Sequence, residues 1–260
     1  MRLLNKTGII TGPAKGMGQA ISETLAREGA DLVLAGRDVA AIEPVAANIR
    51  AMGRKAEIVN ADVTNAKEVE AMVAHAARLF DGRIDILVNV AGTTGPIETP
   101  VWEIDPEDFE MVLRTNVFGT FLPIKYTLPY MVKRRSGKIV NISGTSGLRG
   151  YRYRAAYSAS KWAVRGVTRT VALDVGEYNI NVNAVCPGIV NGPRMDKLCE
   201  GKAQKRGWTK EQVYQEYVDD MALRRVTEAQ DIADAVLFLT SEESRQMTGK
   251  ELAVDGGWDV

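Results

Sequence analysis

The sequence has only two cysteines, one histidine and no long apolar run. Cys186 and Cys199 fit neither a disulfide framework nor a short Cys-x-x-Cys redox or metal motif, so they favour a reducing compartment. His75 lies in a helical pattern, Val69–Leu79, and is expected on the surface of that helix rather than at a catalytic centre. No metal site is therefore expected.

An excess of charge of one sign is also lacking. Lys and Arg number 33, and Asp and Glu also number 33, which gives no electrostatic reason to expect nucleic acid or an anionic membrane as a partner. No apolar run approaches the roughly 18–20 residues of a bilayer-spanning helix. Residues Met1–Lys6 lead into structure too quickly for a secretory signal. We expect a soluble cytoplasmic protein.

What is present is a regular alternation of short apolar runs and longer helical patterns. Such alternation is typical of a parallel sheet with crossover helices, and 260 residues suffice for one large α/β domain over 1–260. The expected strands are Gly8–Thr11, Asp31–Ala35, Ala56–Asn60, Ile84–Asn89, Lys138–Ile142, Asn181–Ala184 and Glu251–Val254. The expected helices are Gly18–Glu28, Val39–Met52, Ala66–Phe80, Pro106–Val132, Ala155–Val175 and Ala229–Leu239.

One segment interrupts this alternation. Val190–Arg225 is long, rich in Lys and Arg, and contains an amphipathic stretch, Lys210–Met221. A long segment late in a regular α/β chain is often a cover over an active site. We therefore expect a substrate lid around residues 190–225.

A glycine-rich turn follows the first expected strand. Gly12, Gly16 and Gly18 are spaced Gly-x-x-x-Gly-x-Gly at the start of a helix, where backbone amides can approach a pyrophosphate. Alone, such a turn also fits a tight strand–helix connection without a ligand. Its position directly after the first strand favours nucleotide binding.

Several motifs occur together in this chain: Thr11–Gly18, Asn89-Val-Ala-Gly92, Asn116, Tyr157-Ser-Ala-Ser-Lys161, Pro187-Gly188 and Val254-Asp-Gly-Gly257. In order and spacing they resemble the short-chain dehydrogenase/reductase family over nearly the whole chain. The resemblance implies a Rossmann-like, doubly wound parallel sheet in a single domain, a nicotinamide cofactor, a Tyr-Lys-Asn-Ser catalytic group and a homotetramer. The cofactor-binding residues that it implies are Gly12, Lys15, Gly16, Met17, Gly18, Arg37, Asp62, Val63, Asn89, Ala91, Gly92, Tyr157, Lys161, Pro187, Gly188 and Ile189.

The end of the second strand predicts which nicotinamide binds. An acidic residue there accepts hydrogen bonds from the 2′-hydroxyl of NAD, whereas the 2′-phosphate of NADP needs cations. Here Gly36 occupies the acidic position, Arg37 follows it, and Lys15 lies in the glycine loop. A guanidinium matches phosphate oxygens well. We expect NADP(H); Asp38, one residue further on, keeps NAD open as the alternative.

Tyr157 and Lys161 lie four residues apart, on one face of the expected helix. A free phenol has a pKa of about 10, and a neighbouring ammonium favours its phenolate form. The resemblance makes Tyr157 the acid/base, lets Lys161 hold the nicotinamide ribose, and gives Asn116 the role of bending a helix and holding a water for proton relay. This chemistry moves a hydride between the cofactor and a small alcohol or carbonyl substrate.

The fourth catalytic residue is missing. The family's serine lies thirteen residues before the tyrosine, and this position is Gly144. If the extended backbone continues, Ser146 shares a face with Gly144 and supplies the hydroxyl; a local bulge would instead bring in Ser143 or Thr145. A third reading is that no hydroxyl replaces the serine.

Two further sets of residues lie near these motifs, one after Pro187 and one made of cations. The family often has threonine five residues after Pro187, but here Gly192 occupies that position, and Asn191 or backbone amides are expected to replace it. Cations crowd the loop before Tyr157 and the expected lid, where they fit an anionic substrate, a subunit contact or an ordinary solvated surface: Arg149, Arg152, Arg154, Lys197, Lys202, Lys205 and Arg206. Two alternatives to the NADP(H)-linked enzyme remain, an NAD-linked catabolic alcohol, sugar or diol dehydrogenase and a cofactor-binding pseudoenzyme.

Overall fold

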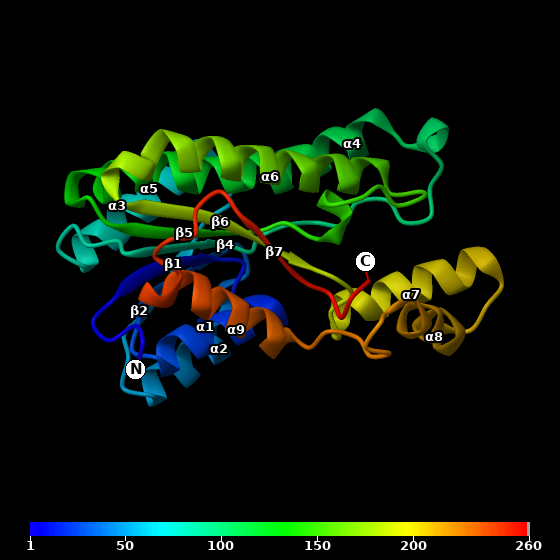
Figure 1. The fold of residues 1–260 in the computed structure, drawn as a ribbon, viewed down its shortest axis with the longest axis horizontal. Coiled ribbons are helices and arrows are strands. Elements are labelled where there is room, and N and C mark those ends of the chain that lie inside the picture. Colours follow the sequence, from blue (N-terminus) through cyan, green and yellow to red (C-terminus); the bar gives the residue numbers. More distant parts are fainter. Residues whose placement is uncertain (259–260) are drawn as a thin grey trace.

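A seven-stranded parallel sheet forms the centre of the computed structural model, which describes residues 1–258 (Figure 1). The strands lie in the order β3-β2-β1-β4-β5-β6-β7, with every neighbouring pair parallel. The chain therefore has the single-domain, Rossmann-like doubly wound fold that the alternation predicts. The strands are β1 (Thr7–Thr11), β2 (Asp31–Gly36), β3 (Ala56–Asn60), β4 (Ile86–Asn89), β5 (Gly137–Ile142), β6 (Ile180–Pro187) and β7 (Glu251–Val254).

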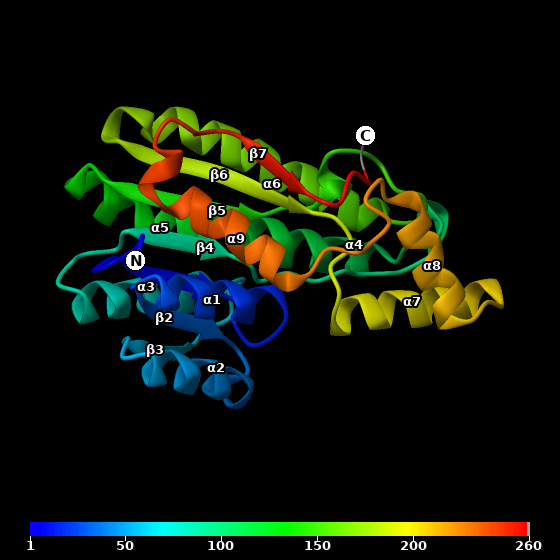
Figure 2. The same cartoon turned by 60° about the horizontal axis from the view of Figure 1, so that its bottom comes forward.

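Helices cover both faces of the sheet (Figures 1 and 2). One face carries α1 (Met17–Arg27), α2 (Val39–Ala51) and α9 (Ala229–Thr240), and the other carries α3 (Ala66–Leu79), α4 (Pro106–Leu113), α5 (Gly119–Arg134) and α6 (Ala155–Val175). Neighbouring strand residues point to opposite faces, so Ile10 packs in the core with α1 and α9, and Ile9 in the core with α3 and α5. Two apolar cores thus enclose the sheet and hold its strand ends in place.

The long helix expected over Pro106–Val132 is interrupted. A π-helical turn at Arg114–Phe118 separates α4 from α5. Within this turn the carbonyl of Asn116 accepts a hydrogen bond from the Thr120 hydroxyl at 2.8 Å, which competes with regular helical bonding. The irregular turn thus includes Asn116, to which the resemblance assigns a helix bend.

The segment Val190–Arg225 forms two helices that project from one end of the molecule (Figure 1). These are α7 (Pro193–Arg206) and α8 (Lys210–Asp220), and α8 matches the expected amphipathic stretch. They enclose a small core of their own, made by Met195, Cys199, Ala203, Val213, Tyr217, Met221, Val226 and Trp258. Cys186 and Cys199 are both buried as free thiols.

The strand order reverses between β1 and β4, the neighbours at the middle of the sheet. In open α/β sheets this reversal leaves a crevice outside the carboxyl ends of the strands. Here α7 and α8 stand beside the same end of the sheet, so the crevice has one further wall (Figure 2).

Candidate active site

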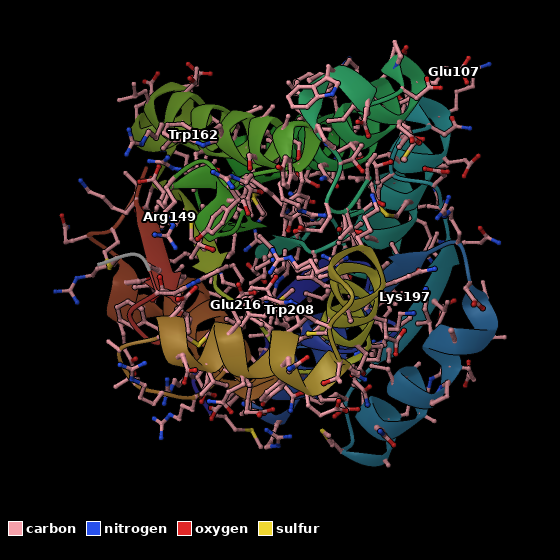
Figure 3. All side chains as sticks on the ribbon, turned by 90° about the vertical axis from the view of Figure 1, so that its right-hand side faces the viewer. Glu107, Arg149, Trp162, Lys197, Trp208 and Glu216 are labelled. Atoms are coloured by element: carbon pink, nitrogen blue, oxygen red, sulfur yellow. The ribbon has the colours of Figure 1, made fainter. Side chains whose placement is uncertain are left out.

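A cleft of about 670 Å³ lies where the carboxyl ends of the strands face α7 and α8. Its lining comes from segments distant in the sequence, including the glycine loop after β1, the turn after β5 and the start of α6. Figure 3 looks onto this end of the molecule, where Arg149, in the loop before α6, and Glu216, on α8, border the same opening.

The glycine loop forms a cradle at the N-terminus of α1. Gly12 and Gly16 have φ angles of 68° and 55°, a region that favours glycine. A Cβ on Gly18 would lie 2.0 Å from the Gly12 carbonyl oxygen, so only glycine fits there. No side chain caps α1, which leaves its first amides available to an anion. Lys15 and Met17 line the cleft beside them, so this loop fits the pyrophosphate of a dinucleotide.

The adenosine end of the cleft is formed by the residues after β2. Gly36, Arg37 and Asp38 all line it. The Arg37 side chain is 80% exposed and pairs with Asp62 at 3.7 Å, whereas the Asp38 carboxylate caps α2 by accepting a hydrogen bond from the Ala41 amide at 3.0 Å. Burial would raise the pKa of Asp62, but hydrogen bonds from Thr64 and the charge of Arg37 lower it. Arg37 is thus an exposed cation on this part of the cleft wall.

Tyr157 and Lys161 occupy the other end of the cleft, on the first turns of α6. The Lys161 ammonium is buried, donates to the Ile142 carbonyl at 2.9 Å, and lies 5.5 Å from the centroid of the Tyr157 ring. Burial alone would raise the pKa of Tyr157, but Lys161, Arg194 and Arg154 together bring it below its ordinary value of 10.0. Burial also lowers the pKa of Lys161.

Asn116 lies behind this pair rather than on the wall of the cleft. Its side chain accepts from the Thr93 amide at 2.8 Å and donates to the Thr93 carbonyl at 3.0 Å and to Ser160 Oγ at 2.9 Å. A Cβ on Gly92 would lie 3.0 Å from Asn116 Oδ1 and 4.0 Å from Lys161 Nζ. Asn116 therefore fixes the loop after β4 against α6, next to the lysine.

The turn after β5 shows where each hydroxyl near Gly144 lies. The strand ends at Ile142, and a 3-10 turn follows at Thr145–Gly147. The backbone is therefore not extended from Gly144 to Ser146, and the expectation that these two residues share a face of a continued strand is not met. Ser143 is buried and donates to the Lys161 carbonyl at 2.9 Å. Ser146 is partly exposed and lines the cleft. A Cβ on Gly144 would lie 3.9 Å from the Tyr157 hydroxyl oxygen, so a serine there would face the tyrosine.

Other expected cofactor residues are divided between the cleft and the interior. Ala91, Gly92, Pro187, Gly188 and Ile189 line the cleft. Asn89, Asp62 and Val63 are not among the residues that line it; Asn89 is buried in the sheet and donates to Asn141 Oδ1 at 2.9 Å. The Asn89 side chain thus fixes β4 to β5 below the site.

Sequence reasoning did not find three residues of the cleft. Arg194 donates to the Gly92 carbonyl at 2.9 Å, and its charge lowers the pKa of Tyr157. Glu98 pairs with Lys202 at 3.5 Å, and Trp258 packs on Tyr151 with ring centroids 4.8 Å apart. Of these three, only Arg194 lies in an element whose bounds the sequence indicates. Pro193 is typical of the first position of a helix, and Gly207 lies just beyond the last residue of the same helix, α7. Arg154, expected as one of several cations, has its guanidinium 4.8 Å from the Tyr157 ring centroid.

Comparison with known proteins assigns this architecture to a family. A family model described as enoyl-(acyl carrier protein) reductase matches residues 12–259. Trans-4-hydroxycyclohexanecarboxylate dehydrogenase of Sinomonas cyclohexanicum is 39% identical over 98% of this chain and 93% of its own, and D-beta-hydroxybutyrate dehydrogenase of Rhizobium meliloti (strain 1021) is 33% identical over 98% and 99%. The chain belongs to the short-chain dehydrogenase/reductase family.

Solved structures of short-chain dehydrogenases/reductases match over nearly the whole length. NAD+-bound xylitol dehydrogenase is 33% identical with a TM-score of 0.94, covering 99% of this chain and 100% of its own. An actinorhodin polyketide ketoreductase variant with NADPH is 30% identical with a TM-score of 0.92, covering 97% of each chain. This protein is thus an NAD(P)-dependent oxidoreductase of the short-chain dehydrogenase/reductase family.

Proposed function

We propose that the protein transfers a hydride reversibly between NADP(H) and the carbinol or carbonyl carbon of a small substrate, with Tyr157 as acid/base. The observation that carries this proposal is the placement of the Tyr157 hydroxyl, which lines the cleft next to the cations Lys161 and Arg194. These charges favour phenolate over phenol. In oxidation the phenolate takes the proton of the substrate alcohol; in reduction the phenol returns a proton to the nascent alkoxide.

The remaining groups of the site bind and orient. NADP(H), when bound, supplies or accepts the hydride. The glycine loop and the N-terminus of α1 would hold its pyrophosphate, and Lys161 would hold the nicotinamide ribose beside Tyr157. Ser143, Thr145 and Ser146 all line the cleft, and Ser146, the partly exposed one of the three, is proposed to donate a hydrogen bond to the substrate oxygen in place of the missing serine.

The preference for NADP(H) is proposed from the residues after β2. Gly36 leaves the ribose position without a carboxylate, and the nearby Asp38 carboxylate already caps α2. Arg37 and Lys15 border the same part of the cleft and can pair with a 2′-phosphate. The second candidate, an NAD-linked alcohol or sugar dehydrogenase, is favoured by the position of Asp38 on the cleft wall and by the similarity to NAD+-bound xylitol dehydrogenase.

The family and the composition also support proposals about the oligomeric state and the cellular compartment of the enzyme. We expect a cytoplasmic homotetramer, because the family resemblance implies this assembly and the cysteines favour a reducing compartment. Within residues 1–258, no helix has the length and apolar character that crossing a membrane requires. Hydroxy acids are natural first substrates to assay, since two relatives are named for them.

Two measurements test the proposed function. Fluorescence titration should show tighter binding of NADPH than of NADH, and Gly36→Asp combined with Arg37→Leu should move the preference toward NADH. The only close contact of a new Cβ at Gly36 is 3.0 Å to the terminal Cδ1 of Ile42, which can move. Tyr157→Phe should remove nearly all turnover and leave NADPH binding largely intact. More than a tenth of the wild-type activity in Tyr157→Phe would show that another group is the acid/base.

A further inference from the structure

Two guanidinium groups lie beside Tyr157 without a carboxylate partner among the described residues. Arg154 is partly buried, sits 4.8 Å from the tyrosine ring centroid, and donates to the Pro96 carbonyl at 3.0 Å. Arg194, at the start of α7, donates to the Gly92 carbonyl at 2.9 Å and lines the cleft with Tyr157, whose pKa its charge lowers. Each arginine thus keeps donors of its planar fork for a further partner.

Two other cations of the cleft are already paired with carboxylates. Lys202 pairs with Glu98 at 3.5 Å, and Arg206 pairs with Glu98 at 3.2 Å and with Glu216 at 2.8 Å. The Glu98 side chain is only 8% exposed and pairs with both cations, and its charge also acts on Arg154. Among the described residues, Arg154 and Arg194 thus place positive charge without an ion-pair partner near Tyr157, next to where the reacting oxygen of a substrate must lie.

Arg154 is partly buried, whereas Arg194 is exposed. A partly buried guanidinium without a counter-ion is costly, so an anionic ligand would offset this cost at Arg154, and Arg194 would add a second set of donors. The phosphates of a dinucleotide are expected at the glycine loop after β1, at the other end of the cleft from Tyr157. The ligand group nearest to Arg154 and Arg194 is then the substrate. Among common substrate anions, a planar carboxylate matches the guanidinium fork with two parallel hydrogen bonds.

We infer that Arg154 and Arg194 bind a carboxylate of the substrate, which makes the substrate a hydroxy acid that is oxidised or an oxo acid that is reduced. This inference rests on the proposed hydride transfer at Tyr157. Because Arg154 lies 4.8 Å from the tyrosine ring centroid and Arg194 is held at the Gly92 carbonyl in the same cleft, the carboxylate lies a few carbon atoms from the reacting carbon. Arg154 and Arg194 are thus specificity-determining residues, and the acid/base remains Tyr157.

An apolar part of the cleft wall is suited to the body of such a substrate. Tyr151 and Tyr217 pack on Trp258 with ring centroids 4.8 and 5.8 Å away, and all three line the cleft. Met195 and Leu198 of α7 extend this apolar wall. Gly144 adds room beside the tyrosine hydroxyl, because it has no side chain there. An aliphatic or alicyclic chain between the carbonyl and the carboxylate fits this surface.

The test compares acids with neutral analogues of the same shape. Straight-chain oxo acids, with one to four carbons between ketone and carboxylate, are assayed with NADPH beside their primary amides. At the preferred spacing, kcat/KM for the acid should exceed that for the amide by about 10- to 100-fold, as expected for hydrogen bonds between charged groups. A ratio near one at every spacing would overturn the inference.

Substitutions assign the effect to the two arginines. Methionine keeps much of the stem of arginine without its charge, so Arg154→Met and Arg194→Met should each lower the acid-to-amide ratio about tenfold or more, mainly through KM of the acid. The matched control is Lys202→Met, which removes a cation of the same cleft that Glu98 already neutralises. Its acid-to-amide ratio should stay within about threefold of the wild type. An equal fall in Lys202→Met would show a general effect of charge, which contradicts a specific carboxylate site.

Calorimetry with an unreactive ligand separates this inference from the proposed function. In the presence of NADPH, cyclohexanecarboxylate should bind at least tenfold more tightly than cyclohexanecarboxamide, and Arg154→Met should remove this difference. If no alcohol or ketone is turned over but the carboxylate is preferred, the proposed function fails and the anion site stands. If ketones are reduced but neither assay distinguishes acid from amide, the anion site fails. If Arg194→Met weakens NADPH binding but leaves the acid-to-amide ratio unchanged, Arg194 binds the cofactor, and its role in the carboxylate site is wrong.

Discussion

Tyr157 owes its proposed chemistry to charges supplied by three different parts of the chain. Lys161 comes from the next turn of α6, Arg154 from the loop before this helix, and Arg194 from the start of α7. Burial opposes the phenolate, and these three cations together outweigh it. The sequence motif predicts Lys161, and Arg154 is expected only as one of several cations in the loop before Tyr157. Arg194 reaches the tyrosine through the tertiary fold, which the motif does not predict.

The pH dependence of alcohol oxidation should show how burial and the three cations together set the pKa of Tyr157. Oxidation needs the phenolate, so kcat with NADP+ should rise with pH and level off above the pKa of Tyr157, which lies below 10.0. Arg154→Met removes one positive charge that favours the phenolate, so the inflection should move to higher pH. A neutral alcohol is used to keep substrate binding independent of Arg154. An inflection that is unchanged or lower in the variant would contradict the charge balance.

The missing serine is a second question at the scale of single residues. Ser143 is already engaged, since its hydroxyl donates to the Lys161 carbonyl at 2.9 Å from a buried position. Ser146 borders the cleft at a partly exposed position in the 3-10 turn. Of these two hydroxyls, the one at Ser146 is better placed to reach a substrate.

Turnover of single variants tests which hydroxyl acts on the substrate. Ser146→Ala should lower kcat by roughly 10²–10³, the usual loss for one donor to a developing oxyanion. Ser143→Ala should mainly lower the thermal midpoint, because it removes a buried hydrogen bond. Thr145→Val serves as a neighbouring control with a small effect on kcat. No loss of kcat in any of the three would show that Tyr157 alone donates to the substrate oxygen.

At the scale of elements, the sequence predicts most of the sheet and its crossover helices. β3, β7 and α6 begin and end where expected. The two strands are the edges of the sheet and are only partly buried, so their bounds follow from the alternation of short apolar runs with helical patterns. Two features were missed for physical reasons. The π-helical turn depends on bonds of Asn116 to residues distant in sequence, and α7 is a charged helix whose apolar positions face only the small core with α8.

This small core should control the order of the α7–α8 segment. Tyr217 packs edge-on against Trp258, with ring centroids 5.8 Å apart, and lies under the Lys202 ammonium at 4.6 Å. Tyr217→Ala should cost this local core about 3–5 kcal/mol. Amide exchange measured by mass spectrometry should then accelerate in α7 and α8 but not in the sheet. Tyr214→Ala, an exposed tyrosine of α8, is the control; equal acceleration in both variants would contradict this role of Tyr217.

At the scale of the whole molecule, large apolar side chains are exposed on the layer opposite α1, α2 and α9. Phe118 and Phe121, at the start of α5, contact each other edge to face with centroids 6.3 Å apart and are 54% and 41% exposed. Trp162 of α6 is 49% exposed and lies on the outer layer in the view of Figure 3. Exposed apolar groups of this size often mark a contact surface between proteins. With the homotetramer that the family resemblance implies, they favour this layer as a subunit interface.

The mass of the protein in solution tests this interface. Introducing a carboxylate into an apolar contact leaves an unpaired charge there, so Phe118→Asp combined with Phe121→Asp should convert the tetramer to dimers or monomers. Sedimentation equilibrium measures the mass, and circular dichroism verifies that the variant is folded. Val39→Asp is the matched control, because Val39 is 40% exposed at the start of α2, on the opposite face of the sheet. A tetramer that persists in the double variant, or that also dissociates in the control, would show that the subunits meet elsewhere.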